Sequence, residues 1–390
     1  MSTKQYRIAK AKEDIHGSLF IVYACLKYLG TSFNNTQKTL LTFVGHKMLF
    51  SIFVFTIYYH TFSDFMYILD VAQKDPKFEN IVPYIHLIAY GVQSIVKLST
   101  IWRKRLVFGQ LIRNLIEVWS MTLLDTEECR QMKEAKLKLL RMQHLWFAST
   151  NICGLIFYSS SPIVVHFYKS YRGMETSIGF IWACWYPFDK NKPIAHVVVY
   201  IFEIFVGYTC DLITITSELM FTSMANHITI LLRSLQMRLR DMGNVKELNY
   251  YPELVENIKL HQRIIRFCRD VEDAFCVMNL SIVTMSSIST CGLFFISLMM
   301  EPVTFVHNKM YLIAYVIHVF MLCWYADNVY HANAEVANAA YECKWYNLDR
   351  RSQRLLCLLM CRSQKPLGFT PLKFTIITLV TRYEYVKILY

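Results

Sequence analysis

Residues 369–390, FTPLKFTIITLVTRYEYVKILY, form a final apolar stretch that follows Pro366 and Gly368. A helix of 22 residues is long enough to cross the hydrocarbon core of a bilayer. The same stretch carries charged side chains, among them Arg382, that lipid tolerates only with partners or water. A spanning helix with this composition is expected to face water. It predicts the wall of an ion pore.

The segment before this helix, Glu335–Leu367, reads EVANAAYECKWYNLDRRSQRLLCLLMCRSQKPL and is expected to be mixed helical. The whole chain of 390 residues is 54% hydrophobic, and its mean hydropathy is +0.28. The apolar residues gather in long blocks, and the formal charge of +12 is confined to the regions between them. This pattern indicates an all-α polytopic membrane protein rather than a nucleic-acid-binding or disordered chain.

Seven apolar blocks are near the roughly 20 residues that a spanning helix needs. The predicted spans are 39–59, 81–101, 144–165, 196–220, 275–300, 310–330 and 369–390. Lysine and arginine divide unequally between the two sets of connections, with 28 on the side of the N-terminus and 6 on the other side. The positive-inside rule therefore predicts a cytoplasmic N-terminus and an extracellular C-terminus.

The connections on the predicted cytoplasmic side are themselves expected to be helical. Within 222–275, an apolar stripe recurs at helical spacing through Leu254, Ile258, His261, Ile265 and Cys268. Within 331–367, Leu348, Leu355 and Leu359 lie opposite three arginines. Such helices either rest on the membrane surface or pack together as an anchor shared between subunits, and their apolar area favours packing. Residues 101–139 are also expected to be largely helical. We predict one membrane domain over 1–390.

The sequence has no catalytic motif: GxSxG, HExxH, P-loop and GxGxxG patterns are missing. Its twelve cysteines show neither CxxC nor metal-ligand spacing, and only Cys184 lies clearly in an outer connection. His46 and His86 are expected to have structural roles within spans. We therefore predict that the protein is not an enzyme and has no cofactor and no metal site.

Three acids fall in the fourth span, at Glu203, Asp211 and Glu218, on or near one helical face. Acids in lipid need partners. The favoured interpretation is that they pair with Lys97, Arg141 or backbone groups and fix helix packing. The alternative is a cation or proton pathway, although the broken Gly/Pro half-helices of such sites are missing.

Aromatic and small residues gather in the outer halves of the second to sixth spans. One interpretation is an aromatic belt with ordinary helix packing, and the other is a closed apolar cavity for a small volatile molecule. The candidate cavity residues are Tyr84, Leu87, Ile88, Gly91, Asn151, Gly154, Tyr158, Tyr200, Phe205, Tyr208, Tyr311, Tyr315 and His318.

In the last span, polar residues repeat every three or four positions and so share a face. Threonines in a membrane helix often bond only to their own backbone, but this does not account for Arg382 with Glu384 and Lys387. Apolar side chains near the outer end are expected to close a pore by dewetting. The candidate pore and gate residues are Thr378, Arg382, Tyr385, Val386, Leu389 and Tyr390.

The C-terminal third resembles the insect odorant receptor family. The matching residues are Ala339, Ala340, Tyr341, Trp345, Leu348, Asp349, Arg350, Met360, Arg362, Gln364, Pro366, Leu367 and Phe374, with the ending Tyr383–Leu389. Asp211 and the run Ile258, His261, Ile265 and Phe267 match more weakly. Glu384 and Lys387 stand where the family usually has smaller or uncharged residues.

The resemblance implies a ligand-gated, non-selective cation channel, assembled as a hetero-tetramer with an obligate co-receptor. The co-receptor's long extra cytoplasmic loop is absent here, so the chain resembles an odour-tuning subunit in the plasma membrane of sensory neurons. The implied partners are the co-receptor, a small volatile organic ligand, membrane lipid and permeating cations, but no nucleic acid. The residues implied to anchor subunits are Ile258, His261, Ile265, Tyr341, Trp345, Leu348, Asp349 and Pro366.

Three alternatives remain open at this stage. A G-protein-coupled receptor would need its N-terminus outside, where Asn34 would be a glycosylation sequon. A gustatory-type channel of the same architecture would work as a homomer. A secondary transporter would use Glu203 and Asp211.

Overall fold

The computed structural model describes residues 3–31, 33, 40–123, 126–174, 177–244, 249–299, 306–371 and 377. All regular secondary structure in these ranges is helical, with no strand, and the longest non-helical stretch is the connection that precedes Pro193. Its elements are α1 Thr3–Ser18, α2 Phe20–Tyr28, α3 Leu40–Lys74, α4 Phe78–Arg103, α5 Arg105–Ser120, α6 Glu127–Tyr171, α7 Pro193–Arg240, α8 Tyr251–Met299, α9 Val306–Glu342, the 3₁₀ turn η1 Trp345–Asn347 and α10 Arg350–Ser363.

Six helices among the described residues are long and apolar enough to cross a membrane. They are Gly45–Lys74, Asn80–Arg103, Glu127–Tyr171, Pro193–Arg240, Tyr251–Leu298 and Lys309–Glu342. They correspond to the first six predicted spans, while the seventh, 369–390, falls almost entirely outside the described residues. The side that faces the cytoplasm stays a prediction from the charge distribution.

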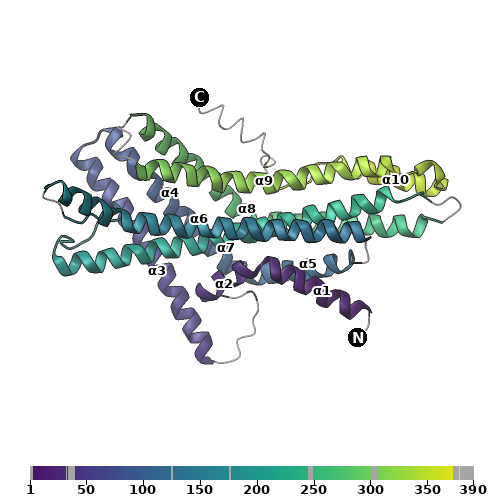
Figure 1. Cartoon of the computed structure of the whole chain (residues 1–390), viewed down its shortest axis with the longest axis horizontal. Helices are drawn as coiled ribbons and strands as arrows, with labels where there is room; N and C mark the ends of the chain where they lie inside the picture. The colour runs from purple at the N-terminus through teal and green to yellow at the C-terminus, as the bar shows by residue number, and fades with distance from the viewer. Residues whose placement is uncertain are drawn as a thin grey trace.

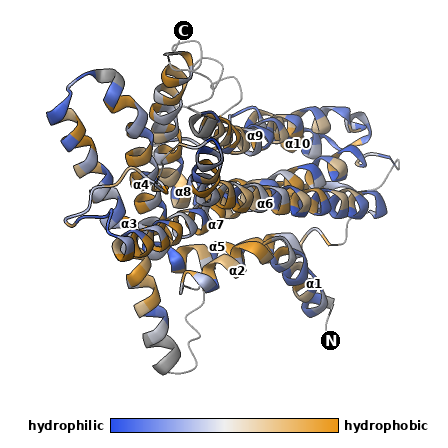
Figure 2. Ribbon diagram, turned by 60° about the vertical axis from the view of Figure 1, so that its left-hand side comes forward, coloured by the Kyte–Doolittle hydropathy of each residue, from blue (hydrophilic) through white to orange (hydrophobic). Residues whose placement is uncertain are grey.

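Helices α6, α7, α8 and α9 run side by side and continue well beyond the predicted spans, whereas α3 is steeply inclined to them (Figure 1). With 48 residues, α7 is about 72 Å long, more than twice the hydrocarbon thickness of about 30 Å. Figure 2 shows hydrophobic ribbon along their middle and mainly hydrophilic ribbon at the far end near α10. The segments predicted to form the anchor are thus continuations of the spanning helices.

Helix α7 is the centre of the bundle. Most of its side chains between Leu212 and Leu239 are buried, and it contacts α2, α3, α4, α6, α8 and α9. In contrast, α6 exposes large apolar side chains, including Ile152, Ile156 and Phe167. An exposed apolar face of this kind fits lipid rather than water.

The predicted apolar stripe on α8 faces the core of the chain, because Leu254, His261, Ile265 and Cys268 are buried and Ile258 packs against the same core. The second anchor segment is not one continuous helix. It breaks after Glu342, passes through η1 and restarts at Arg350, with α10 packed on α9 and α8.

Asp349 begins α10 as its N-cap. Its carboxylate accepts hydrogen bonds from the backbone N–H groups of Arg351 and Ser352, which satisfies two donors that the first helical turn leaves open. The hydrogen bond with Ser352 lowers the pKa of Asp349 below its usual value. Leu356 and Leu359 of α10 are buried, whereas Leu355 of the predicted stripe is half-buried.

The tight turn that follows α7 contacts the segment between α9 and α10. Gly243 has a φ of +81°, and a Cβ at this position would lie 2.5 Å from the carbonyl oxygen of Lys344. The Lys344 N–H donates to the Met242 carbonyl (3.2 Å), and the Asn347 amide donates to the Gly243 carbonyl (2.9 Å). The two anchor segments therefore approach each other at a site that only glycine fits.

We expect Gly243→Ala to destabilise the protein by about 1–3 kcal/mol, because alanine is strained at positive φ and its methyl group meets backbone. Thermal unfolding of the purified chain in detergent measures the change. Gly154→Ala is the matched control, since this helical glycine has no atom within 4 Å of an added Cβ. Equal melting temperatures for the two variants would contradict the role of the turn.

Candidate functional site

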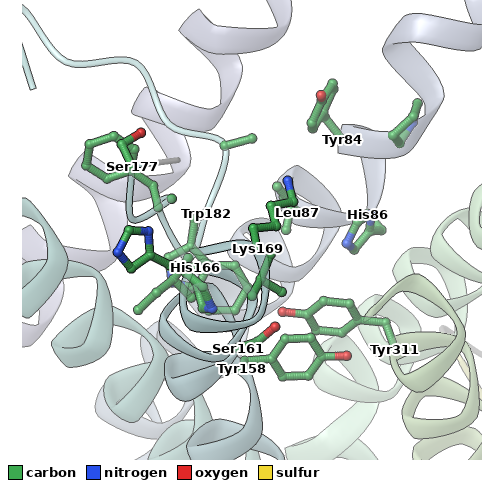
Figure 3. Close-up of a pocket in the computed structure, with 17 residues that line it drawn as sticks. Tyr84, His86, Leu87, Tyr158, Ser161, His166, Lys169, Ser177, Trp182 and Tyr311 are labelled. Carbon is green, nitrogen blue, oxygen red and sulfur yellow. The ribbon is translucent and has the colours of Figure 1, made fainter. Parts of the chain in front are cut away.

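A cavity of about 430 Å³ lies between α4, α6, the first turns of α9 and the connection from α6 to α7 (Figure 3). This volume is within the range of small-molecule sites. The lining residues are Pro83, Tyr84, His86, Leu87, Tyr158, Ser161, Pro162, Val165, His166, Lys169, Ser177, Gly179, Phe180, Ile181, Trp182, Ala183 and Tyr311.

Three aromatic rings form one wall of this cavity. Tyr158 and Tyr311 stack with their ring centroids 4.2 Å apart and their planes 18° apart. The Trp182 ring lies 6.3 Å from Tyr158 and 6.2 Å from Tyr311. Such a wall offers a flat, polarisable surface to an apolar ligand.

Trp182 reaches this position because a buried acid holds the α6–α7 connection. The Glu203 carboxylate accepts hydrogen bonds from the backbone N–H groups of Ile181 (2.7 Å) and Trp182 (3.2 Å), and from the Tyr186 hydroxyl (3.3 Å). The Trp182 indole N–H also donates to the Glu203 carbonyl (3.2 Å). Glu203 is 1% exposed, and these hydrogen bonds from the connection satisfy its buried carboxyl oxygens.

Two polar groups in the lining have unused hydrogen-bonding capacity. Both ring nitrogens of His86 and the hydroxyl of Tyr311 are shielded from solvent and lack a hydrogen-bond partner in the part of the chain that the structure describes. The two rings are neighbours, with centroids 5.1 Å apart. Neighbouring side chains cover these atoms, so a ligand in the cavity would bond to them only after those side chains move.

A second, smaller cavity of about 20 Å³ lies behind the first. Leu87 and Trp182 line both cavities and so separate them. Gly91 lines the small one, and an added Cβ there would lie 2.4 Å from the Thr61 hydroxyl oxygen. Glycine at position 91 therefore allows α4 to pack closely on α3, and it also keeps the small cavity open.

Four residues predicted for the cavity from the sequence do line the large one: Tyr84, Leu87, Tyr158 and Tyr311. Tyr315 lies just behind it, and its hydroxyl donates to the His86 carbonyl (3.4 Å).

The remaining candidates line neither cavity, and most make other contacts. Asn151 donates to the Phe147 carbonyl, Tyr200 donates to the Ser159 carbonyl, and Phe205 stacks on Phe53. His318 pairs with Glu218. The other members of this group are Ile88, Gly154 and Tyr208.

The α6–α7 connection supplies Ser177 and residues 179–183 to the cavity, a contribution that was not predicted from the sequence. A signal was present, because residues 178–188 read IGFIWACWYPF and are too apolar for a connection surrounded by water. His86 was also not predicted to line the cavity and was assigned a purely structural role.

The three acids of α7 all have partners, as the packing interpretation expected. Glu218 lies 2.9 Å from the Lys97 ammonium and 2.9 Å from His318 Nδ1, and Asp211 accepts from the Tyr90 hydroxyl (3.2 Å). These contacts join α7 to α4 and α9. Asp211 and Glu218 therefore act as fixed links between helices, and Glu203 fixes the α6–α7 connection to α7.

The pore and gate candidates, Thr378, Arg382, Tyr385, Val386, Leu389 and Tyr390, lie outside the described residues. The anchor candidates divide into two groups. Ile258, His261, Ile265 and Leu348 pack inside the subunit, and His261 lies 3.4 Å from the Asn333 amide oxygen. The exposed candidates are Tyr341, Trp345, Asp349 and Pro366.

Comparison with known proteins gives consistent matches. The family model described as "7tm Odorant receptor" matches residues 77–390. Odorant receptor 67c of Drosophila melanogaster is 25% identical over 238 residues, covering 60% of this chain and 58% of that relative. Putative odorant receptor 85d of the same organism is 21% identical over 345 residues, covering 84% and 80%.

Among solved structures, the insect olfactory receptor OR5 from Machilis hrabei in complex with eugenol aligns with a TM-score of 0.79 at 15% identity. The alignment covers 98% of this chain and 97% of that one. Another structure of the same receptor gives a TM-score of 0.75. These alignments confirm the predicted all-α, multi-helix membrane fold.

Proposed function

The chain belongs to the insect odorant receptor family, and from this premise we propose that it is an odour-tuning subunit of a ligand-gated, non-selective cation channel. A small volatile molecule binds in the cavity between α4, α6 and α9. The pore is lined by residues 369–390 of each subunit, and the channel is a hetero-tetramer with a co-receptor in the plasma membrane of sensory neurons. The family is one of receptors, in agreement with the prediction that the chain is not an enzyme.

The observation that carries this proposal is the aromatic cavity with one polar edge. Tyr158, Trp182 and Tyr311 offer ring faces, while the His86 ring and the Tyr311 hydroxyl lie beside them and would offer hydrogen bonds once a ligand displaces the side chains that cover them. The preferred ligand class is accordingly a compact apolar molecule with one oxygen-containing group. The relative from Machilis hrabei, with the same fold, was solved in complex with eugenol.

Binding opens the pore only if the ligand prefers the open arrangement of the helices, since a ligand with equal affinity for both states shifts nothing. The α6–α7 connection and α9 both contact the cavity, and α9 continues into the anchor that packs with α10. A change in the width of the cavity would therefore move α9, and through its packing with α10 it would reach the region where residues 369–390 begin.

Whole-cell recording from cells that express this chain with the co-receptor tests the proposal. We expect agonists from a volatile panel to evoke cation currents, and Ser161→Trp to raise the half-maximal concentration at least about tenfold by filling the cavity. Val164→Trp is the control, since Val164 is on the same helix, is exposed and does not line the cavity.

The alternatives predict different recordings. Full currents without the co-receptor would indicate a homomeric, gustatory-type channel. Currents that require G-protein signalling, or substrate uptake without a gated current, would contradict the channel proposal. Equal sensitivity of Ser161→Trp and the parent chain would place the agonist elsewhere.

A further inference from the structure

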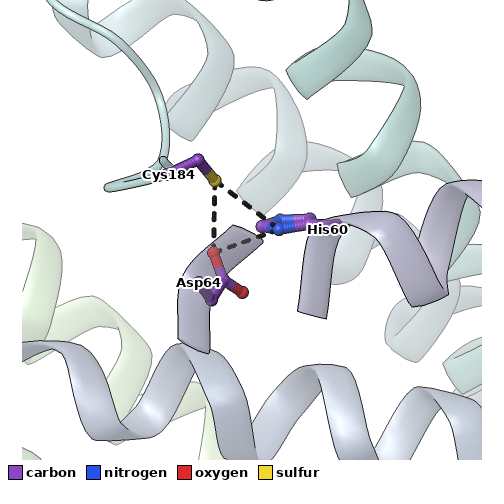
Figure 4. A group of neighbouring side chains, drawn as sticks. All are labelled: His60, Asp64 and Cys184. Atoms are coloured by element: carbon purple, nitrogen blue, oxygen red, sulfur yellow. Dashed lines mark hydrogen bonds and ion pairs between the residues drawn. The ribbon is translucent and has the colours of Figure 1, made fainter. Parts of the chain in front are cut away.

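Three side chains with metal-binding atoms meet where the α6–α7 connection crosses α3 (Figure 4). His60 and Asp64 are four residues apart on α3 and so share a face, and Cys184 comes from the connection. His60 Nδ1 lies 3.1 Å from Asp64 Oδ1, and Cys184 Sγ lies 3.6 Å from His60 Nδ1 and 3.2 Å from Asp64 Oδ1.

These separations are close to three edges of a metal tetrahedron. A zinc ion bonded at about 2.3 Å to sulfur and about 2.0–2.1 Å to nitrogen and oxygen keeps S about 3.6 Å from both N and O, and keeps N and O about 3.3 Å apart. The Sγ–Oδ1 separation of 3.2 Å is the shortest relative to this geometry, by about 0.4 Å. The three atoms therefore need only small adjustments to bind one ion. Thiolate, imidazole and carboxylate together suit zinc, whereas magnesium and calcium prefer oxygen ligands alone.

The surroundings also fit a metal site. The cluster is enclosed, since the side chains of His60 and Asp64 are 12% and 3% exposed and Cys184 is 2% exposed. The small cavity of about 20 Å³ touches His60 and Asp64 and has room for about one water molecule, which would complete the tetrahedron. The Lys190 ammonium fixes the backbone beside the thiol by donating to the Cys184 carbonyl (2.9 Å).

Without metal, the Cys184 thiol keeps its proton, because burial and the nearby carboxylates raise its pKa. The S–H then points to Asp64 as a donor. Metal binding would release this proton to solvent and replace the S–H bond with a metal–sulfur bond, with no change of oxidation state. His60 would bind through Nδ1 and carry its proton on Nε2.

We propose that His60, Asp64 and Cys184 form a zinc site that fastens the α6–α7 connection to α3. Cys184 is two residues from Trp182, which forms the wall between the two cavities. The bound ion would hold this wall in place. The proposal concerns metal binding by the folded chain, and it does not require the channel activity proposed above.

Cobalt(II) serves as a spectroscopic probe of this site in the purified full chain in detergent. The exposed Cys357 and Cys361 of α10 are first replaced by serine, so that thiolate absorption does not arise from them. We expect a thiolate-to-cobalt charge-transfer band that saturates at one equivalent and disappears when zinc is added. Cys184→Ser should abolish the band and weaken zinc binding by more than about tenfold, the lower bound for losing even an outer-shell partner.

Cys153→Ser is the matched control, because Cys153 is an exposed thiol outside the cluster, and this variant should keep the band and the affinity. Asp64→Asn, which nearly preserves the side-chain shape, provides a second test if Cys184→Ser fails to fold. Zinc affinity unchanged in Asp64→Asn and Cys184→Ser, or a folded parent chain without a thiolate band, would overturn the proposal.

Discussion

Replacing Trp182 with alanine is expected to raise the agonist concentration for half-maximal current by about 10–100-fold. The indole forms the wall between the two cavities and faces Tyr158 and Tyr311. Losing an aromatic face of this size removes about 1.5–3 kcal/mol of contact energy from a ligand packed against it. Dose–response curves for agonists of increasing length measure the effect, and longer agonists should lose less because the two cavities become continuous.

Trp185→Ala is the control for this prediction. Trp185 lies in the same α6–α7 connection, its side chain is 36% exposed, and it lines neither cavity. The same substitution there should change the half-maximal concentration by less than about threefold. If both variants lose sensitivity equally while reaching the cell surface, the indole of Trp182 affects the folding of the connection and does not contact the agonist.

The helical bundle was predictable because an apolar block of about 20 residues in a membrane must satisfy its own backbone hydrogen bonds, which a spanning helix does. The predicted spans were shorter than the helices, since hydropathy marks only the part in lipid. Beyond the predicted span, α7 continues to Arg240, and most side chains of this continuation are buried in protein and do not face lipid. The break after Glu342 was missed because Cys343–Asp349 contains neither proline nor glycine, and the interruption depends on tertiary contacts such as the Lys344 hydrogen bond to Met242.

The candidate site was only partly predictable for a similar reason. Aromatic residues on helices could be assigned to the outer halves of the spans, and Tyr158 and Tyr311 do meet there. Trp182 was missed because a connection has no period that would show where its side chains point. Cys184 is more than a hundred residues from His60 and Asp64, so the sequence spacing could not reveal their proximity.

The ion pair between Lys97 and Glu218 gives the largest expected effect on stability. Their side chains are only 1% and 8% exposed, with the ammonium nitrogen 2.9 Å from the carboxylate, and His318 Nδ1 lies at the same distance from it. Lys97→Met would remove the cation and leave a buried carboxylate with one remaining partner. Breaking a buried pair in this way costs about 3–5 kcal/mol, enough to prevent folding of many proteins.

We therefore expect Lys97→Met to abolish surface expression or to lower the melting temperature strongly, and Lys97→Met with Glu218→Leu to recover much of the loss. The recovery follows because an apolar pair of similar size needs no desolvated charge. Lys259→Met is the matched control, since Lys259 pairs with Glu256 in an exposed position and should contribute less than about 1 kcal/mol. A double variant no more stable than Lys97→Met would mean that the charges themselves, and not the shape of the contact between α4, α7 and α9, are required for folding.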